Sequence, residues 1–127
     1  VYGYNKIEFT QKLNASIAST KKIEDYQVQN KVSNLLTGLG FHEMLGNSLT
    51  SPSYGKLLES VKDEYYVTML NPLSQDLSVM RQSMLFGALE ALSYNNNRRM
   101  NNVKLFEFGK TYHSYAGGRE EKKHLSL

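Results

Sequence analysis

Five polar side chains lie close together in the middle of the chain. They are Asn71, Ser74, Ser78, Arg81 and Ser83, and they separate an apolar, β-branched run from a helix-like run. Loops between a strand and a helix often carry the binding and catalytic groups of a fold. The spacing therefore suggests, at first, an active-site loop within residues 67–110.

One carboxylate stands in an unusual place. Glu107 lies between Phe106 and Phe108 in a run that is apolar on both faces. An unpaired buried carboxylate costs several kcal/mol, so Glu107 needs a partner or a raised pKa. Arg81 is the candidate partner, and a structural ion pair between Arg81 and Glu107 is favoured over a catalytic role.

Other chemistries find no support in the residue spacing. His42, His113 and His124 are far apart and the chain has no Cys, so no metal site is predicted. No Ser stands in a Gly-x-Ser-x-Gly elbow. The Gly-Leu-Gly of residues 38–40 follows a helix-like run, which indicates a helix end rather than a dinucleotide fingerprint. We assign no catalytic, cofactor-binding or metal-binding residue.

A basic and amide-rich block could contact nucleic acid. Residues 95–102 contain five Asn together with Arg98 and Arg99, and Arg119 lies further along the chain. Such groups donate to phosphate oxygens. The more common interpretation is a solvated connection between a helix and a strand. The net charge of +3 permits a nucleic-acid partner but does not indicate one.

Composition places the chain among soluble globular domains. It has 127 residues, of which 40% are hydrophobic and 21% are charged. No apolar run is long enough to span a membrane, and no signal peptide is visible. The absence of Cys fits a cytoplasmic protein, and the missing initiator Met suggests a piece of a longer one.

Hydrophobic periodicity predicts two helices. Asp25 is the expected N-cap of the first, Gly40 its expected end, and its apolar stripe is expected to pack on a sheet. The second is expected over residues 83–95, with Ser83 as its N-cap and the Asn block as its end. The stripe of the first helix contains Val28, Val32, Leu35, Leu36 and Leu39.

The remaining pattern predicts strands. We expect strands over residues 42–50, 65–70 and 103–112, and a short helix over residues 54–61. The strand over 103–112 is apolar on both faces, which is typical of a central strand. Residues 117–118 form a turn, residues 119–123 a charged hairpin tip, and residues 124–127 begin a returning strand. This order predicts an α+β fold with a mostly antiparallel sheet.

Several segments resemble, in order and spacing, the synthetase-like core of the beta subunit of bacterial phenylalanyl-tRNA synthetases. They are residues 34–43, 71–74 (Asn-Pro-Leu-Ser), 78–81 (Ser-Val-Met-Arg), 83–92 and 106–110 (Phe-Glu-Phe-Gly-Lys). One departure is Phe86, where that family commonly has Pro. The resemblance covers most of the chain and rests on the joint register of the segments.

The resemblance implies a class II synthetase-like antiparallel sheet flanked by helices, and an incomplete one. Residues 1–22 would be a linker or arm, and residues 23–127 the core with its motif 1-like and motif 2-like parts. Catalytic class II subunits carry an Arg after the first motif 2 strand, which holds phosphate and carboxylate. Here that place falls near His113, and no Arg occurs before Arg119.

The resemblance therefore implies a non-catalytic domain that supports assembly with an alpha subunit. In the family, two alpha and two beta subunits attach phenylalanine to tRNA(Phe). ATP and magnesium belong to the whole complex, and this domain would bind neither. Two alternatives stay open, namely an active class II adenylate-forming enzyme and a tRNA-binding module that uses Arg98, Arg99 and Arg119.

Overall fold

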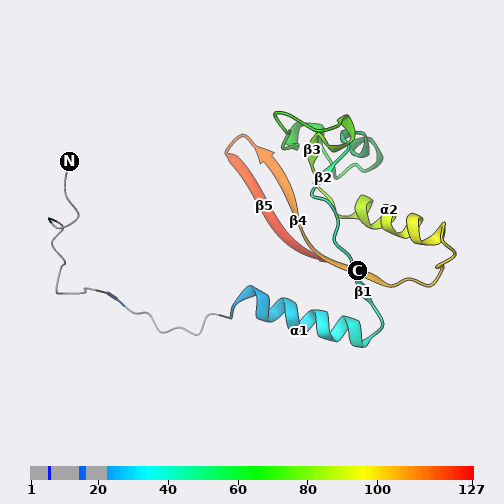
Figure 1. Cartoon of the computed structure of the whole chain (residues 1–127). Helices are drawn as coiled ribbons and strands as arrows, with labels where there is room; N and C mark the ends of the chain where they lie inside the picture. Colours follow the sequence, from blue (N-terminus) through cyan, green and yellow to red (C-terminus); the bar gives the residue numbers. More distant parts are fainter. Residues whose placement is uncertain (1–5, 7–14, 17–22) are drawn as a thin grey trace.

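The computed structural model describes residues 6, 15–16 and 23–127 and shows a mixed α/β arrangement (Figure 1). The elements in chain order are α1 (Asp25–Gly38), β1 (His42–Glu43), β2 (Leu49–Thr50), the 3-10 helices η2 (Pro52–Leu57), η3 (Asp63–Tyr65) and η4 (Gln75–Leu77), β3 (Val79–Met80), α2 (Leu85–Asn96), β4 (Leu105–Tyr115) and β5 (Gly118–Ser126). The predicted arm over residues 1–22 lies outside the described residues, apart from residues 6, 15 and 16.

The strands form two small sheets. One has the order β1-β4-β5, with β1 parallel and β5 antiparallel to β4, and the other pairs β2 with β3 antiparallel. The expected central position of β4 is therefore confirmed. Phe106 is its most buried residue, with 1% of its surface exposed, and Leu36, Val61, Val79 and Met84 complete the buried apolar core of the described residues.

The first helix ends as its sequence predicts. Gly40 has a φ of 84°, a left-handed conformation that glycine adopts without steric cost. The amide of Phe41 then donates to the carbonyl of Leu36 at 3.0 Å, which closes the last turn. Its predicted start is wrong by one residue, because Glu24 is the N-cap and no side chain caps the helix. Asp25 is the first helical residue, where its negative charge interacts favourably with the positive end of the helix dipole.

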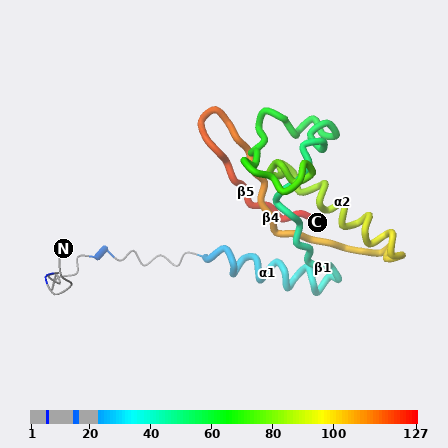
Figure 2. Tube along the Cα trace, turned by 45° about the horizontal axis from the view of Figure 1, so that its top comes forward, coloured from blue at the N-terminus to red at the C-terminus, as the bar shows by residue number. Residues whose placement is uncertain are grey.

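The predicted packing of the α1 stripe on the sheet is also wrong. Only Leu36 of the stripe is buried, whereas Val28, Leu35 and Leu39 are 49%, 63% and 58% exposed. Figure 2 shows α1 at the margin of the molecule, and its first residue, Asp25, pairs with Lys123 on β5. An apolar face is therefore left uncovered on this helix.

Residues 42–50 form two short strands rather than one. The amides of His42 and Met44 donate to the carbonyls of Lys104 and Phe106, both at 2.8 Å, and the chain then turns away from β4. The side chain of Asn47 accepts from the amide of Leu49 at 3.0 Å, which holds this turn. The second half, β2, joins β3 in the other sheet.

Residues 65–70 do not form the predicted strand. Tyr65 ends η3, and the segment touches β3 only through an isolated bridge between Thr68 and Val79. The predicted short helix over residues 54–61 is likewise replaced by η2, which Pro52 opens. Polar groups and prolines in this region divide the chain into pieces that are too short for a regular strand.

The hairpin is longer than the sequence predicts. The turn is formed by Ala116 and Gly117, so β4 continues to Tyr115 and β5 begins at Gly118. Residues 119–123, predicted as the hairpin tip, lie inside β5. The tight turn removes the need for a longer loop, because two residues suffice to join antiparallel strands.

The second helix begins two residues later than predicted and ends within one residue of the prediction. Ser83 is not the N-cap, but its Oγ accepts from the amide of Leu85 at 3.2 Å. Asn97 is the C-cap, and Arg99 takes a left-handed φ of 63° beyond it. None of the helices in the described residues is long and apolar enough to cross a membrane.

Candidate functional site

The polar centre of the structure is a buried ion pair between Arg81 and Glu107. Arg81 follows β3, Glu107 lies on β4, and the Nη2 of Arg81 is 2.8 Å from the Oε1 of Glu107. The two side chains are 5% and 3% exposed. Two further bonds hold the pair, because the Nε of Arg81 donates to the carbonyl of Lys110 at 2.9 Å and the amide of Gly46 donates to Glu107 at 3.2 Å.

Two glycines make room for this pair. A Cβ at Gly109 would lie 2.2 Å from the Nη2 of Arg81, and a Cβ at Gly46 would lie 2.9 Å from its Nη1. Both distances are far below a van der Waals contact, so any side chain at these positions would displace the guanidinium. The sequence signal for Gly109 was its place directly beside the Phe-Glu-Phe run.

The pair is not fully satisfied. The Nη1 of Arg81 and the Oε2 of Glu107 are buried and have no hydrogen-bond partner among the described residues. The positive charge of Arg81 nevertheless faces the carboxylate of Glu107 at close range. Two nitrogens of the Arg81 guanidinium therefore bind groups of the same chain, Glu107 and the carbonyl of Lys110. This arrangement does not favour bidentate binding of a substrate phosphate or carboxylate by Arg81.

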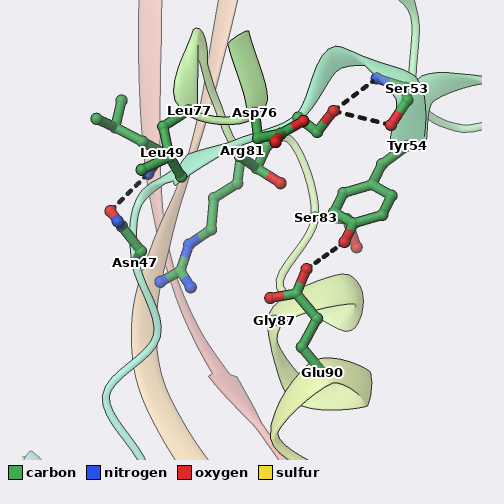
Figure 3. A pocket seen from close by; sticks show the side chains of 12 residues that line it. Asn47, Leu49, Ser53, Tyr54, Asp76, Leu77, Arg81, Ser83, Gly87 and Glu90 are labelled. Carbon is green, nitrogen blue, oxygen red and sulfur yellow. Dashed lines mark hydrogen bonds between the residues drawn. The ribbon is translucent and has the colours of Figure 1, made fainter. Parts of the chain in front are cut away.

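Beside the ion pair lies a polar cavity of about 540 Å3, shown in Figure 3. Tyr54 donates to Glu90 on α2, and the ring of Tyr54 stacks on Phe86 with a centroid distance of 4.4 Å. The hydrogen bond to Glu90 raises the pKa of Tyr54 above its ordinary 10.0. Asp76 and Arg81 also line this cavity, so its wall carries two carboxylates and one guanidinium.

The polar loop that the sequence singles out does not converge on one point. Asn71 and Ser74 are exposed, and Ser78 turns inward to donate to the carbonyl of Gln75 at 2.9 Å. Arg81 binds Glu107, and Ser83 lies at the start of α2. Among the described residues, these side chains therefore contact groups of the same chain at separate points.

Sequence reasoning missed one residue of this region, Gln82. Its side-chain oxygen accepts from the amide of Lys62 at 3.0 Å, and its amide nitrogen donates to the carbonyl of Lys62 at 2.7 Å. This double contact fastens residue 62 to the segment before α2. No motif marks such a residue, although its position directly after Arg81 was a weak signal.

His113 lies on β4, at the position that the sequence comparison singled out for its lack of an Arg. Its Nδ1 is buried without a hydrogen-bond partner in the described structure, and its ring stacks on Tyr115 with a centroid distance of 5.7 Å. Burial lowers the pKa of His113 below its ordinary 6.5. At neutral pH this position therefore presents an uncharged ring instead of a fixed positive charge.

The three arginines predicted as nucleic-acid contacts are not brought together. Arg98 and Arg99 follow α2, whereas Arg119 lies at the start of β5, next to the hairpin turn. Figures 1 and 2 place that turn and the end of α2 at opposite sides of the molecule. Arg98 lies over the ring of Tyr94, 3.3 Å from its centroid. No group of acidic or histidine residues suited to a metal ion is found in the described residues.

The fold and the site thus define a small mixed α/β domain whose buried charged groups bind one another. Comparison with known proteins gives the family. The family model described as the phenylalanyl tRNA synthetase beta chain CLM domain matches residues 10–127. The chain belongs to this family.

Similar proteins of known name are beta subunits of phenylalanine–tRNA ligases. A phenylalanine–tRNA ligase beta subunit of Porphyromonas gingivalis is 44% identical over 127 residues, and one of Bacteroides thetaiotaomicron is 43% identical over 128 residues. A third, of Carboxydothermus hydrogenoformans, is 40% identical over 113 residues, or 87% of this chain. The chain spans 16% of the length of the first two relatives and 14% of the third.

Proposed function

We propose that this chain is a non-catalytic, class II synthetase-like domain that supports the assembly of a phenylalanine–tRNA ligase. Its partner would be the alpha subunit, in a complex of two alpha and two beta subunits that works in the cytoplasm. ATP, magnesium and tRNA(Phe) would be bound by the whole complex. The family membership and the names of the relatives support this proposal.

The uncovered face of α1 is the observation that carries the proposal. Val28, Leu35 and Leu39 lie on one side of this helix and are about half exposed or more. Exposed apolar patches of this kind mark surfaces that another protein covers. A helix–helix contact with the alpha subunit would remove this stripe from water, in the position that the resemblance gives to the motif 1 interface helix.

The chemistry of the sheet supports a non-catalytic role. An adenylate-forming site needs a cationic fork on the strand after the motif 2 start, and His113 stands there with a lowered pKa. Arg81 is held by Glu107 at 2.8 Å. We propose a class II core as the finer fold class. It is compatible with a central β4, an antiparallel β4–β5 hairpin and a parallel β1 that follows α1.

Assembly is tested in the full beta subunit co-expressed with its alpha subunit. We expect Leu35→Glu to reduce recovery of the complex in size-exclusion chromatography, because a charge at a buried helix contact is costly. Leu73→Glu is the matched control, since Leu73 is 99% exposed and far from α1 in the chain. Equal recovery of the two variants would contradict assembly through α1.

Catalysis is tested by ATP–pyrophosphate exchange with the 127-residue chain and phenylalanine. We expect no exchange above the background of a protein-free control. Measurable exchange that requires phenylalanine would refute the non-catalytic proposal and favour the adenylate-forming alternative.

One observation favours a second candidate function, contact with tRNA. The guanidinium of Arg98 lies over the ring of Tyr94, and the next residue, Arg99, is exposed, so two cationic residues lie at one end of α2. If this end binds phosphate, the affinity of the chain for tRNA(Phe) should fall steeply with salt. It should fall further in the Arg98→Ala, Arg99→Ala variant, and a filter-binding titration without either effect excludes this candidate.

A further inference from the structure

The two ends of α1 are held to the sheet in different ways. At the C-terminal end Leu36 is buried, and the amide of His42 donates to the carbonyl of Lys104 at 2.8 Å. The side chain of Lys104 adds a second contact, because its Nζ donates to the carbonyl of Leu39 at 3.4 Å and lies 5.6 Å from the centre of the Phe41 ring. Backbone and side-chain contacts together fix this end of the helix.

The N-terminal half of α1 is separated from the β4–β5 hairpin by a cavity. Residues 25–28 are all exposed, and Gln29 lines a cavity of about 240 Å3 whose other lining residues belong to the two strands. Phe108 of β4 and Lys123 and Leu125 of β5 are among them. Close packing therefore contributes little to the position of this half of the helix.

An ion pair joins this half of α1 to the hairpin. Lys123 donates to the carboxylate of Asp25, the first residue of the helix. On the same face of the hairpin Lys110 lies opposite Lys123, and Lys110 is paired with Glu121 at 2.6 Å. Asp25 therefore supplies a negative charge that offsets the second lysine. Its carboxylate also lies at the positive end of the helix dipole.

We propose that the Asp25–Lys123 pair positions α1 for contact with its partner subunit, an inference that rests on the proposed assembly through α1. The pair sets the tilt of the helix. The tilt in turn sets the direction in which the exposed stripe of Val28, Leu35 and Leu39 faces. Asp25 and Lys123 are positioning residues, because neither belongs to that stripe.

The length of the helix makes its tilt important for the stripe. Val28 lies ten residues before the end of the helix at Gly38, which is about 15 Å along the axis. A tilt of about 10° at the fixed end would move Val28 by about 3 Å. Close-packed contacts tolerate much smaller displacements. A helix that tilts freely would therefore spend only part of its time in the orientation that binds, and its apparent affinity would fall by that fraction.

The expected effect is modest and measurable. The side chains of Asp25 and Lys123 are 75% and 55% exposed. Exposed ion pairs of this kind shift an equilibrium toward one arrangement by a factor of about two to five. The affinity for the alpha subunit should change by about the same factor, because only the correctly tilted helix binds.

The test uses the full beta subunit and measures its affinity for the alpha subunit at low ionic strength. Lys123→Gln should bind about two- to fivefold more weakly than the parent, whereas Lys123→Arg keeps the cation and should bind as the parent does. Asp25→Asn should weaken binding to a similar extent. The double variant Asp25→Asn, Lys123→Gln should bind no more weakly than the weaker single variant, because both changes break the same pair.

Lys122→Gln is the matched control, because it makes the same substitution at the preceding residue of β5. Lys122 also has an exposed pair, with Glu120 at 3.1 Å, but that pair lies within the hairpin. This variant should bind the alpha subunit as the parent does. Salt gives a further check. The difference between Lys123→Gln and the parent should vanish at about 1 M salt, where the screening length is about 3 Å.

Amide exchange in the free beta subunit tests the pair without the partner. In Lys123→Gln the amides of residues 29–32 should exchange faster, because the first turns of α1 lose their attachment to the hairpin. The amide of Phe41, which donates to the carbonyl of Leu36, should be unaffected. Unchanged exchange over residues 29–32 would overturn the proposal whatever the binding result.

The binding results separate this proposal from the proposed function. If Leu35→Glu leaves assembly intact, assembly does not use α1, and the pair has no role in it. If Leu35→Glu prevents assembly but Lys123→Gln binds as well as Lys122→Gln, the interface stands and the positioning role is wrong. Weak binding that Lys123→Arg shares, or losses that add in the double variant, would also overturn the positioning role.

Discussion

Removal of Arg81 provides the most direct test of how this domain is held together. In Arg81→Ala the ion pair to Glu107 and the hydrogen bond to the carbonyl of Lys110 are lost. Glu107, which is 3% exposed, keeps only the amide of Gly46 at 3.2 Å. A buried charge without a partner is far more costly than a missing surface contact.

The expected loss in the free energy of unfolding is about 3 to 5 kcal/mol. A domain of this kind has a total of about 5 to 15 kcal/mol, so the variant would lose a large share of its stability. The matched control is Lys122→Ala, which breaks the exposed pair of Lys122 with Glu120, whose side chains are 57% and 41% exposed. That change should stay within about 0.5 kcal/mol.

Urea denaturation followed by far-ultraviolet circular dichroism measures both variants, and a double-mutant cycle isolates the pair. Glu107→Gln and the double variant Arg81→Ala, Glu107→Gln complete the cycle. The double variant should be more stable than the sum of the two single losses predicts, because no unpaired charge remains. A loss of less than about 0.5 kcal/mol for Arg81→Ala, or strict additivity in the cycle, would refute the reasoning.

Three further outcomes are expected from the same measurements. Gly109→Ala should lower the free energy of unfolding by about 1 to 3 kcal/mol, because its Cβ would lie 2.2 Å from Arg81. Gly117→Ala should be nearly neutral, because its Cβ would meet nothing within 4 Å, and equal losses for the two variants would contradict this reasoning. Burial lowers the pKa of His113, so as pH falls the unfolded chain binds this proton before the folded chain does. The free energy of unfolding should therefore fall as pH drops below about 6.5, and His113→Gln should flatten this dependence. An unchanged pH profile in the variant would exclude His113 as its source. Arg99→Gly should raise the free energy of unfolding by about 0.5 kcal/mol, because glycine adopts the φ of 63° without strain; a loss would show that the Arg99 side chain makes a stabilising contact.

The sequence predicted those elements whose signal is local or strongly periodic. The end of α1 followed from one glycine, and the central place of β4 followed from a strand that is apolar on both faces. A run of three Asn correctly indicated the end of α2. Each of these signals is carried by neighbouring residues and needs no knowledge of distant parts of the chain.

The errors arose where distant contacts decide the structure. Residues 42–50 alternate like one strand, yet Gly46 must approach Glu107, and the chain bends there to leave β4 for the other sheet. The stripe of α1 has the pattern of a core face, but Leu36 is the only one of its residues that is buried among the described residues. Periodicity reports that a face is apolar, and it does not report whether the covering surface belongs to the same molecule.

The candidate site shows the same division. A buried carboxylate between two aromatic residues demanded a partner, and Arg81 was the only arginine within the polar loop, so the sequence could nominate the two residues. The glycines that surround them, and the contact of Gln82 with residue 62, depend on close approaches that no spacing encodes.

The backbone of Arg81 also connects the two sheets, which share no ladder. Its amide donates to the carbonyl of Ser48 at 2.9 Å, and its carbonyl accepts from the amide of Tyr112 at the same distance. The first bond continues the β2–β3 pair, and the second joins that pair to β4. A fluctuation that separates β4 from the β2–β3 pair must therefore break the bond to Tyr112 together with the ion pair. The amide of Tyr112 should exchange with solvent hydrogen only when this junction opens, whereas the amide of Arg81 can stay protected by Ser48.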